Sequence, residues 1–317
     1  MGLEVKDLSK KYSGKTVVDH VSFSMDKPGV YALLGTNGAG KTTTIRMMLD
    51  MLDKDSGEVL WNGQPLSFDN CNIGYLAEER GLYQKYPLMD QIIYFGRLRG
   101  VSDDELKKKI RYWSGRLKLD EYLYPVETKD ARGRVKKQKP KSPDQLSKGN
   151  QQKIQFLIAM LSDPELLVLD EPFSGLDPVN TDILKDVVRE QIDAGKYIIM
   201  SSHQMPVVEE FCTDITIMSR SKALVQGNLN EIKKSYGRVN LTLKCETDVK
   251  DYIEKQGIEI LSSKEFEYEL RVKGDEQANA LLKDLVNSGI TVVRFDLSEL
   301  SLHEIFVKEV GANEEQQ

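Results

Sequence analysis

The chain has 317 residues and a formal net charge of -6 at pH 7, with 30% charged and 40% hydrophobic residues. These proportions are ordinary for a globular protein, and at ~150 residues per domain the length predicts two domains. The acidic balance gives no general attraction to nucleic acid, and no run approaches the ~18 apolar residues of a membrane span, so a role at a membrane would require a partner.

The spacing of the cysteines fits a reducing compartment, and the N-terminus does not read as a signal peptide. Cys71, Cys212 and Cys245 are far apart and form no C-x-x-C pair. This spacing argues against a disulfide framework and against a zinc site. The first seven residues alternate apolar and charged side chains and lack the features of a signal peptide.

The N-terminal third reads as short strands separated by turns. Residues 3–8 and 17–25 contain the alternating pattern of half-buried strands. Residues 30–34 are entirely apolar and predict a buried strand. Further strands are expected within 55–63 and at 73–76.

A glycine-rich stretch follows the apolar strand at residues 30–34. Residues 35–42 read GTNGAGKT and match the phosphate-loop pattern G-x-x-x-x-G-K-[ST] at every fixed position. Residues 43–49 predict the start of a helix, whose N-terminus adds partial positive charge to the backbone N–H groups of the loop. The alternative, a glycine-rich turn with a chance lysine, is disfavoured by this strand and helix context.

The predicted nucleotide-binding residues of this loop are Gly35, Thr36, Asn37, Gly38, Ala39, Gly40, Lys41, Thr42 and Thr43. Lys41 is expected to reach the β- and γ-phosphates, and the Thr42 hydroxyl is expected to hold Mg²⁺.

The middle of the chain changes to helical periodicity. Apolar residues recur at helical spacing from about Leu88 to Leu123, within a helical subdomain of about 85–160. Residues 126–142 contain almost no apolar side chains and are rich in lysine and arginine. We expect a solvated loop there. The alternative is a contact with anionic lipid or with an acidic face of a partner.

Two buried strands of the next region end in polar residues. Residues 166–169 are apolar and end at Asp170 and Glu171, and residues 197–202 end at His203. The carboxyl edge of a parallel sheet carries its ligand site. Asp170 is therefore expected to hold Mg²⁺, and Glu171 to act as a general base toward water. An acidic turn without function is the alternative reading.

The remaining elements complete two domains. Helices are expected at 146–160 and 179–192, and a hairpin of 215–218 and 223–227 closes a first domain of residues 1–230. A β-α-β-β-α-β order then predicts a small α+β ferredoxin-like domain at 236–310. Its expected elements are strands at 239–243, 258–261, 266–272 and 290–295, helices at 249–256 and 277–288, a last helix at 300–310 and a polar tail at 311–317.

The motifs together resemble the ATP-binding subunits of ABC transporters, over residues 3–229. Residues 146–152 read LSKGNQQ and are similar to the LSGGQ signature of that family, a short distance before Asp170. Residues 174–177 resemble its D-loop, and His203 resembles its switch histidine. Tyr12 lies where the family stacks an aromatic ring on adenine. The resemblance implies an α/β P-loop ATPase domain with a mixed sheet core, an antiparallel β subdomain and a helical subdomain.

The family mechanism implies a head-to-tail dimer with ATP between the phosphate loop of one chain and the signature of the other. Ser147, Gly149 and Asn150 would then present donors to the γ-phosphate, aided by the helix dipole. His203 would contact the γ-phosphate, and Asp177 would communicate between the two sites. A surface histidine and an exposed turn tyrosine are the alternatives for His203 and Tyr12.

Two departures from the family pattern concern this site. Lys148 replaces the first glycine of the signature and Asn150 its glutamine, whereas Ser147 and Gly149 are kept. Glu78 stands about where the family has a glutamine that contacts Mg²⁺ and the membrane partner. A carboxylate can ligate Mg²⁺ but adds negative charge beside the γ-phosphate. We therefore expect Glu78 to be a metal ligand that makes turnover more dependent on Mg²⁺.

The sequences at 74–76, 78–83 and 301–306 resemble bacterial exporters of sodium, drugs and peptides. The expected function is thus an ATP-hydrolysing motor subunit on the cytoplasmic face of the membrane, paired with a separately encoded permease and with a second ATP-binding subunit. A soluble ABC ATPase acting on nucleic acid or ribosomes is the alternative, disfavoured by the single phosphate loop, the absence of sustained heptads and the acidic balance. A non-hydrolysing regulator is a third reading. The C-terminal domain would brace the dimer or sense a ligand.

Overall fold

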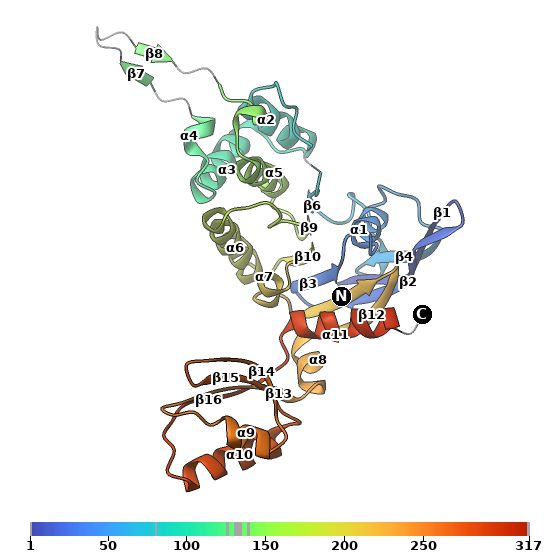
Figure 1. The fold of residues 1–317 in the computed structure, drawn as a ribbon. Helices are drawn as coiled ribbons and strands as arrows, with labels where there is room; N and C mark the ends of the chain where they lie inside the picture. Colours follow the sequence, from blue (N-terminus) through green and yellow to red (C-terminus); the bar gives the residue numbers. More distant parts are fainter. Residues whose placement is uncertain (1, 80, 125–126, 130–134, 138–139, 316–317) are drawn as a thin grey trace. The chain divides into compact units, whose positions relative to one another are not determined.

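The computed structural model describes residues 2–79, 81–124, 127–129, 135–137 and 140–315. The chain divides into two compact units, residues 1–225 and 226–317 (Figure 1). Each unit is described by itself. Within the described ranges, no helix is long and apolar enough to cross a membrane.

A six-stranded sheet with the order β12-β11-β3-β10-β9-β6 forms the centre of the first unit. Strands β3, β6, β9, β10 and β11 run parallel to their neighbours within that group. All residues of β3 and β9 are buried, as expected for parallel strands covered on both faces. The strands are β3 (Gly29–Gly35), β6 (Ile73–Leu76), β9 (Leu166–Asp170), β10 (Tyr197–Ser202), β11 (Asp214–Ser219) and β12 (Lys222–Asn228).

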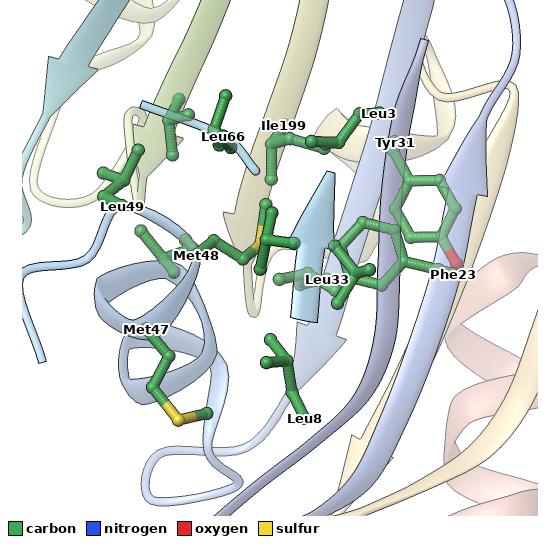
Figure 2. Packing of buried hydrophobic residues seen from close by; sticks show 14 of the residues in the cluster. Leu3, Leu8, Phe23, Tyr31, Leu33, Met47, Met48, Leu49, Leu66 and Ile199 are labelled. Carbon is green, nitrogen blue, oxygen red and sulfur yellow. The ribbon is translucent and has the colours of Figure 1, made fainter. Parts of the chain in front are cut away.

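A four-stranded antiparallel sheet packs against this centre. It consists of β1 (Leu3–Tyr12), β2 (Lys15–Met25), β4 (Ser56–Trp61) and β5 (Gln64–Pro65), in the order β2-β1-β4-β5. Leu3 and Phe23 from this sheet meet Tyr31 and Leu33 of β3 and Met48 of α1 (Lys41–Met48) in one buried cluster (Figure 2). The rings of Phe23 and Tyr31 stack with centroids 4.4 Å apart. Packing of α1 into this cluster fixes the helix that follows the phosphate loop.

The predicted helical subdomain is present; α3 buries one apolar face, whereas α5 is buried along most of its length. In α3, Leu106, Ile110 and Trp113 are buried, at the spacing of successive helical turns. The helices are α2 (Leu88–Leu98), α3 (Asp103–Arg116), α4 (Asp120–Leu123), the 3₁₀ turn η1 (Pro143–Gln145) and α5 (Lys148–Met160). Helices α6 (Pro178–Asp193) and α7 (Met205–Glu209) follow β9 and β10.

The basic segment departs from the sequence-based expectation. Instead of a loop throughout, β7 (Glu127–Lys129) and β8 (Val135–Lys137) pair as antiparallel strands. The expectation of a loop was wrong for these six residues because a backbone ladder between two strands needs no apolar pattern. The rest of the segment expected as a loop at 126, 130–134 and 138–139 lies outside the described residues.

The second unit contains the expected β-α-β-β-α-β succession. Its antiparallel strands lie in the order β14-β15-β13-β16, with Leu241, Leu243, Ile253, Leu281 and Leu285 in one buried core. The elements are α8 (Leu229–Ser235), β13 (Arg238–Cys245), α9 (Lys250–Lys255), β14 (Glu259–Lys264), β15 (Glu267–Arg271), α10 (Asp275–Asn287) and β16 (Val292–Glu299). The α/β class with an additional small α+β unit is thereby confirmed.

The last helix is longer than expected. Helix α11 runs from Leu302 to Glu315, whereas the sequence pattern placed its end at Val310 and a tail after it. Alanine and glutamate, which follow Gly311, are good helix formers, and a single internal glycine costs only about 1 kcal/mol relative to alanine. The first part of the expected tail is therefore helical.

Candidate functional site

The phosphate loop joins β3 to α1 in a conformation that requires glycine. Gly40 has φ +108°, and a Cβ atom there would lie 2.6 Å from the carbonyl oxygen of Val17. Neither a side-chain cap nor an acidic residue occupies the first turn of α1. The first N–H groups of any helix lack an intrahelical acceptor, and among the described residues no capping side chain accepts from those of α1 either. This end of α1 is therefore suited to bind an anion.

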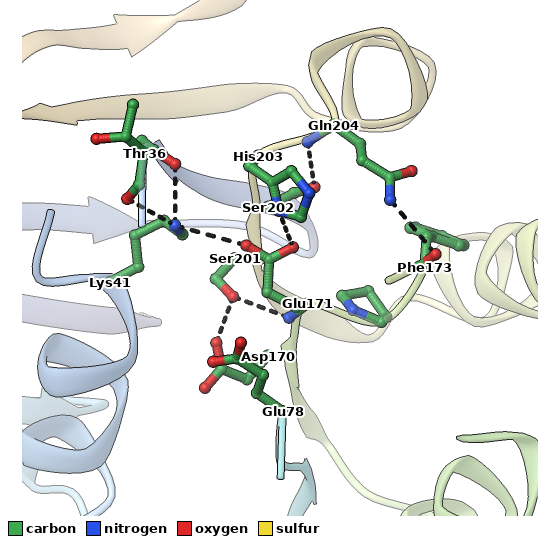
Figure 3. Close-up of polar contacts among 12 residues, drawn as sticks. Thr36, Lys41, Glu78, Asp170, Glu171, Phe173, Ser201, Ser202, His203 and Gln204 are labelled. Carbon is green, nitrogen blue, oxygen red and sulfur yellow. Dashed lines mark hydrogen bonds and ion pairs between the residues drawn. The ribbon is translucent and has the colours of Figure 1, made fainter. Parts of the chain in front are cut away.

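Lys41 bridges the loop and the end of β9. Its side chain is 6% exposed, and Nζ donates hydrogen bonds to the carbonyl oxygens of Gly35 (2.9 Å) and Thr36 (3.2 Å). The same Nζ lies 3.5 Å from Oε1 of Glu171 (Figure 3). A buried ammonium group thus lies between the loop and a buried carboxylate.

Glu171 lies between a lysine and a histidine. Its side chain is 5% exposed, and Oε2 lies 2.8 Å from Nδ1 of His203 (Figure 3). The backbone of Glu171 has φ +51°, a conformation that L-residues rarely adopt and that concentrates at functional sites. The Glu171 carboxylate is therefore held by two side chains from opposite directions, Lys41 and His203.

Ser201, which sequence reasoning missed, connects the two acidic residues. Its Oγ donates to Oδ1 of Asp170 at 2.5 Å and accepts from the backbone N of Glu171 at 3.0 Å. Ser201 pairs directly with Asp170 across the parallel strands β10 and β9. The available signal was a serine at the end of an otherwise apolar strand.

Asp170, Thr42 and Glu78 bring oxygen atoms together at the start of α1. The Thr42 hydroxyl lies 3.2 Å from Oδ1 of Asp170 and 3.4 Å from Oε2 of Glu78. Burial raises the pKa of the Asp170 carboxyl, with hydrogen bonds from Ser201 and Thr42 opposing that shift. The second oxygen, Oδ2, is buried without a hydrogen-bond partner among the described residues.

These oxygens fit Mg²⁺. A hard cation prefers oxygen ligands and is usually bound through one or two carboxylates together with substrate phosphates. The unpartnered oxygen of Asp170 and the neighbouring Thr42 hydroxyl supply such ligands. In the described part of the chain no group of three or more His, Cys, Asp or Glu side chains is placed to hold a metal without other ligands. The donor set therefore suits a metal that arrives with a nucleotide.

A cavity of about 310 Å³ opens over the loop. It is lined by Val17, the six residues from Asn37 to Thr42, Thr43, Glu78 and Glu171. Ligand sites in proteins commonly start at about this volume. Tyr12 lies at the tip of the hairpin formed by β1 and β2 and is 47% exposed. The β2 strand of the same hairpin contributes Val17 to the cavity lining.

The signature residues form a second group at the N-terminus of α5. Ser147 caps this helix, since its Oγ accepts from the backbone N of Asn150 at 3.2 Å. A Cβ atom at Gly149 would lie 3.2 Å from Leu176 and 3.4 Å from Asn180. No acidic residue lies in the first turn of α5, so its N-terminus keeps its partial positive charge.

Asp177 caps the neighbouring helix α6. Its carboxylate accepts from the backbone N of Asn180 at 3.0 Å and from Nδ2 of Asn180 at 2.5 Å. The first of these hydrogen bonds makes the largest contribution to a lowered pKa of Asp177. Within the described residues, no hydrogen bond or ion pair joins Ser147, Asn150 or Asp177 to the phosphate loop. One copy of the chain thus contains two separate groups.

Comparisons with known proteins identify the family of the chain. A family model described as ABC transporter matches residues 18–174, and one described as the C-terminal domain of DrrA1-3-like ATP-binding proteins matches residues 227–310. YhaQ of Bacillus subtilis (strain 168), an uncharacterized ABC transporter ATP-binding protein, is 38% identical, covering 98% of this chain and 99% of the relative. The Nod factor export ATP-binding protein I of Sinorhizobium fredii is 29% identical, covering 72% and 63%.

A comparison with solved structures also finds an ABC transporter ATP-binding subunit. The structure of an ATP-binding subunit of an ABC transporter is 29% identical, with a TM-score of 0.63, and the match covers 74% of this chain and 93% of that chain. The chain belongs to the family of ABC transporter ATP-binding subunits, which bind and hydrolyse ATP.

Proposed function

We propose that this chain is the motor subunit of an exporter and powers a separately encoded transmembrane permease. The carrying observation is the cluster in which Glu171 lies between Lys41 and His203 beside the phosphate loop. A catalytic base next to a phosphate-binding loop is what ATP hydrolysis requires. The kept set of catalytic side chains also speaks against a non-hydrolysing regulator.

In this proposal the loop residues 35–43 bind the phosphates, and Lys41 leaves its carbonyl contacts for the β- and γ-phosphates. Glu171 accepts a proton from the attacking water while the bond between the γ-phosphorus and the bridging oxygen breaks, which releases ADP and phosphate. His203 holds the carboxylate of Glu171 and contacts the γ-phosphate. Tyr12 stacks on the adenine.

Thr42, Asp170 and Glu78 would hold Mg²⁺. The bound ion would neutralise charge on the β- and γ-phosphate oxygens. The raised pKa of Asp170 fits a carboxylate whose charge is costly until a cation arrives. Ser201 keeps this carboxylate aimed at the loop through its short hydrogen bond.

The separate signature group supports a two-chain site. Ser147, Gly149 and Asn150 of one copy would face ATP bound to the loop of a second ATP-binding subunit, with Asp177 between the two sites. The uncompensated N-terminus of α5 favours an anionic ligand. The one-chain arrangement holds this group apart from the phosphate loop, which is consistent with completion in trans.

The names of two matches support a proposal for the direction of transport and the place of action. One similar protein carries export in its name, and the matched C-terminal family is that of DrrA-like proteins. We infer outward transport from the cytoplasmic side, with the chain peripheral on the inner face of the cell membrane. We assign ATP binding to residues 1–230 and bracing of the dimer to 236–310.

Affinity capture tests the permease partnership. The tagged chain would be recovered from its own cells after solubilising membranes in a mild detergent, with the Lys41→Met variant as the matched control for nucleotide-dependent association. A co-purifying protein with several membrane spans supports the exporter. Recovery of ribosomes, nucleic acid or only soluble partners would instead favour a soluble ABC ATPase acting as a switch.

A further inference from the structure

A tyrosine on α4 contacts the N-terminus of the signature helix. Nδ2 of Asn150 donates to the hydroxyl of Tyr122 at 3.0 Å. The backbone N of the same asparagine donates to Oγ of Ser147 at 3.2 Å. Both of these contacts are made at the end of α5 that would face the phosphate. Tyr122 lies 28 positions before Asn150 in the sequence, so this contact depends on the packing of α4 near α5.

Tyr122 is itself held in place. The backbone N of Tyr122 donates to the carbonyl oxygen of Leu119, and neighbouring Leu123 is buried. Burial is the largest cause of a raised pKa of the Tyr122 hydroxyl, so the group is neutral at physiological pH. A neutral hydroxyl keeps its own proton and accepts the hydrogen bond that Asn150 donates.

The ring of Tyr122 carries a second contact. Nζ of Lys141 lies 4.5 Å from the ring centroid, within the range of a cation–π interaction. The carbonyl oxygen of Lys141 accepts from the backbone N of Leu88, the first residue of α2. Tyr122 precedes the segment that contains β7 and β8, and Lys141 follows it. The ring therefore joins both ends of that segment to the signature helix.

We propose that Tyr122 is a positioning residue for ATP hydrolysis, which holds Asn150 so that the N-terminus of α5 presents its donors to the γ-phosphate bound by a second subunit. Lys141 supports the ring through its cation–π contact. This inference rests on the proposed two-chain site. Asparagine is one methylene shorter than the glutamine usual in the signature, so its amide reaches less far and an external hydroxyl can fix its rotamer.

Tyr122→Phe is the sharpest variant because it removes the hydroxyl and keeps the ring over which Lys141 lies. Loss of one hydrogen bond predicts a fall in kcat of about 3- to 10-fold. The dissociation constant of ATP from the single subunit should stay within about 2-fold, since the phosphate loop of that subunit is untouched. Lys141→Gln should give a smaller loss in the same direction. Tyr112→Phe, on the exposed side of α3, is the matched control and should leave all values unchanged.

A double-mutant cycle in the full-length chain tests the contact itself. Asn150→Ala should lower kcat, and adding Tyr122→Phe to it should cause no further loss, because the two groups act through one hydrogen bond. In a Glu171→Gln background, Tyr122→Phe should raise the ATP concentration that gives half-maximal dimer by the same factor as it lowers kcat.

Each outcome decides the matter. A Tyr122→Phe enzyme with wild-type kcat overturns the inference, as do independent, multiplicative losses in the double variant. If kcat falls together with the melting temperature and with the affinity of the single subunit for ATP, the role of Tyr122 is merely structural, and this also overturns the inference. If the wild-type chain neither hydrolyses ATP nor dimerises in its presence, the proposed function itself fails. A Tyr122→Phe enzyme with wild-type kcat would overturn only the inference about Tyr122 and would leave the proposed function standing.

Discussion

Oε2 of Glu171 lies 2.8 Å from Nδ1 of His203, although the two residues come from the ends of different strands. The carboxylate is 5% exposed, whereas the imidazole is 46% exposed. A buried carboxylate is thus joined to a histidine at the surface of the site. We therefore propose that His203 orients the Glu171 carboxylate.

Replacing His203 by alanine should therefore impair turnover rather than binding. Without the imidazole, the Glu171 carboxylate loses one of its two partners, and we expect kcat to fall about 10²-fold with the dissociation constant of ATP nearly unchanged. Steady-state kinetics and ATP titration measure the two quantities. His303→Ala, an exposed histidine on α11, is the matched control. An equal loss in both variants would argue against a specific role of His203.

Ser201→Ala should lower both stability and turnover. The change leaves the buried backbone N–H of Glu171 without its acceptor, at a cost of about 1–3 kcal/mol in the free energy of unfolding. It also removes the donor to Asp170, so kcat should fall about 10-fold. Urea denaturation and kinetics test this. Ser202→Ala removes only an acceptor from Gln204 and should retain most of the activity, and a larger loss there would contradict the account.

Glu78 should determine the response to Mg²⁺. Oε2 of Glu78 lies 3.4 Å from the Thr42 hydroxyl, and its charge adds to that of Asp170 nearby. In Glu78→Gln one anionic ligand is lost, and we expect the Mg²⁺ concentration that gives half-maximal ATPase activity to rise about 3- to 10-fold. Glu79→Gln, the exposed neighbour, serves as control. An unchanged Mg²⁺ titration would remove Glu78 from the metal site.

Glu304 should make the second unit sensitive to acid. Burial pushes the pKa of its carboxyl up, but hydrogen bonds from Ser301, Asn240 and Arg271 outweigh burial and hold the pKa below the usual 4.5. A lowered pKa of an acid stabilises the fold above the unfolded-state pKa, and this stabilisation is lost as pH falls through the folded-state value.

Glu304→Gln should accordingly destabilise the chain by about 1–2 kcal/mol at pH 7 and by much less below the lowered folded-state pKa, where the wild-type carboxyl is also protonated. Chemical denaturation at several pH values measures the difference. Glu276→Gln, on the exposed start of α10, should show no such dependence. A gap between wild type and Glu304→Gln that stays constant with pH would disprove the assignment.

Motifs and hydrophobic periodicity predicted those parts of the structure that depend on residues close together in the sequence. The phosphate loop could be predicted because its glycines, Lys41 and Thr42 lie within eight positions. The second unit could be predicted because alternation and helical spacing mark each of its elements, and the observed strand order is the ferredoxin-like one.

Other features depend on register and on long-range contacts. Ser201 contacts Asp170 only because β10 and β9 pair in a register that brings these two residues opposite one another. The hydrogen bond between Asn150 and Tyr122 depends on how α4 packs beside α5. The strands β7 and β8 had no apolar alternation to reveal them. The Tyr122 contact and the β7–β8 pairing leave no local sequence signal, and for Ser201 the only signal was a serine near the end of an otherwise apolar strand.

The most direct test of the central claim is the ATPase activity of Glu171→Gln, measured together with its affinity for ATP. The amide cannot accept the proton of water but keeps the size of the side chain. We predict that kcat falls at least about 10²-fold while the dissociation constant of ATP changes less than about 3-fold. A variant that keeps a third or more of the wild-type kcat would show that Glu171 is not the base and would contradict the account.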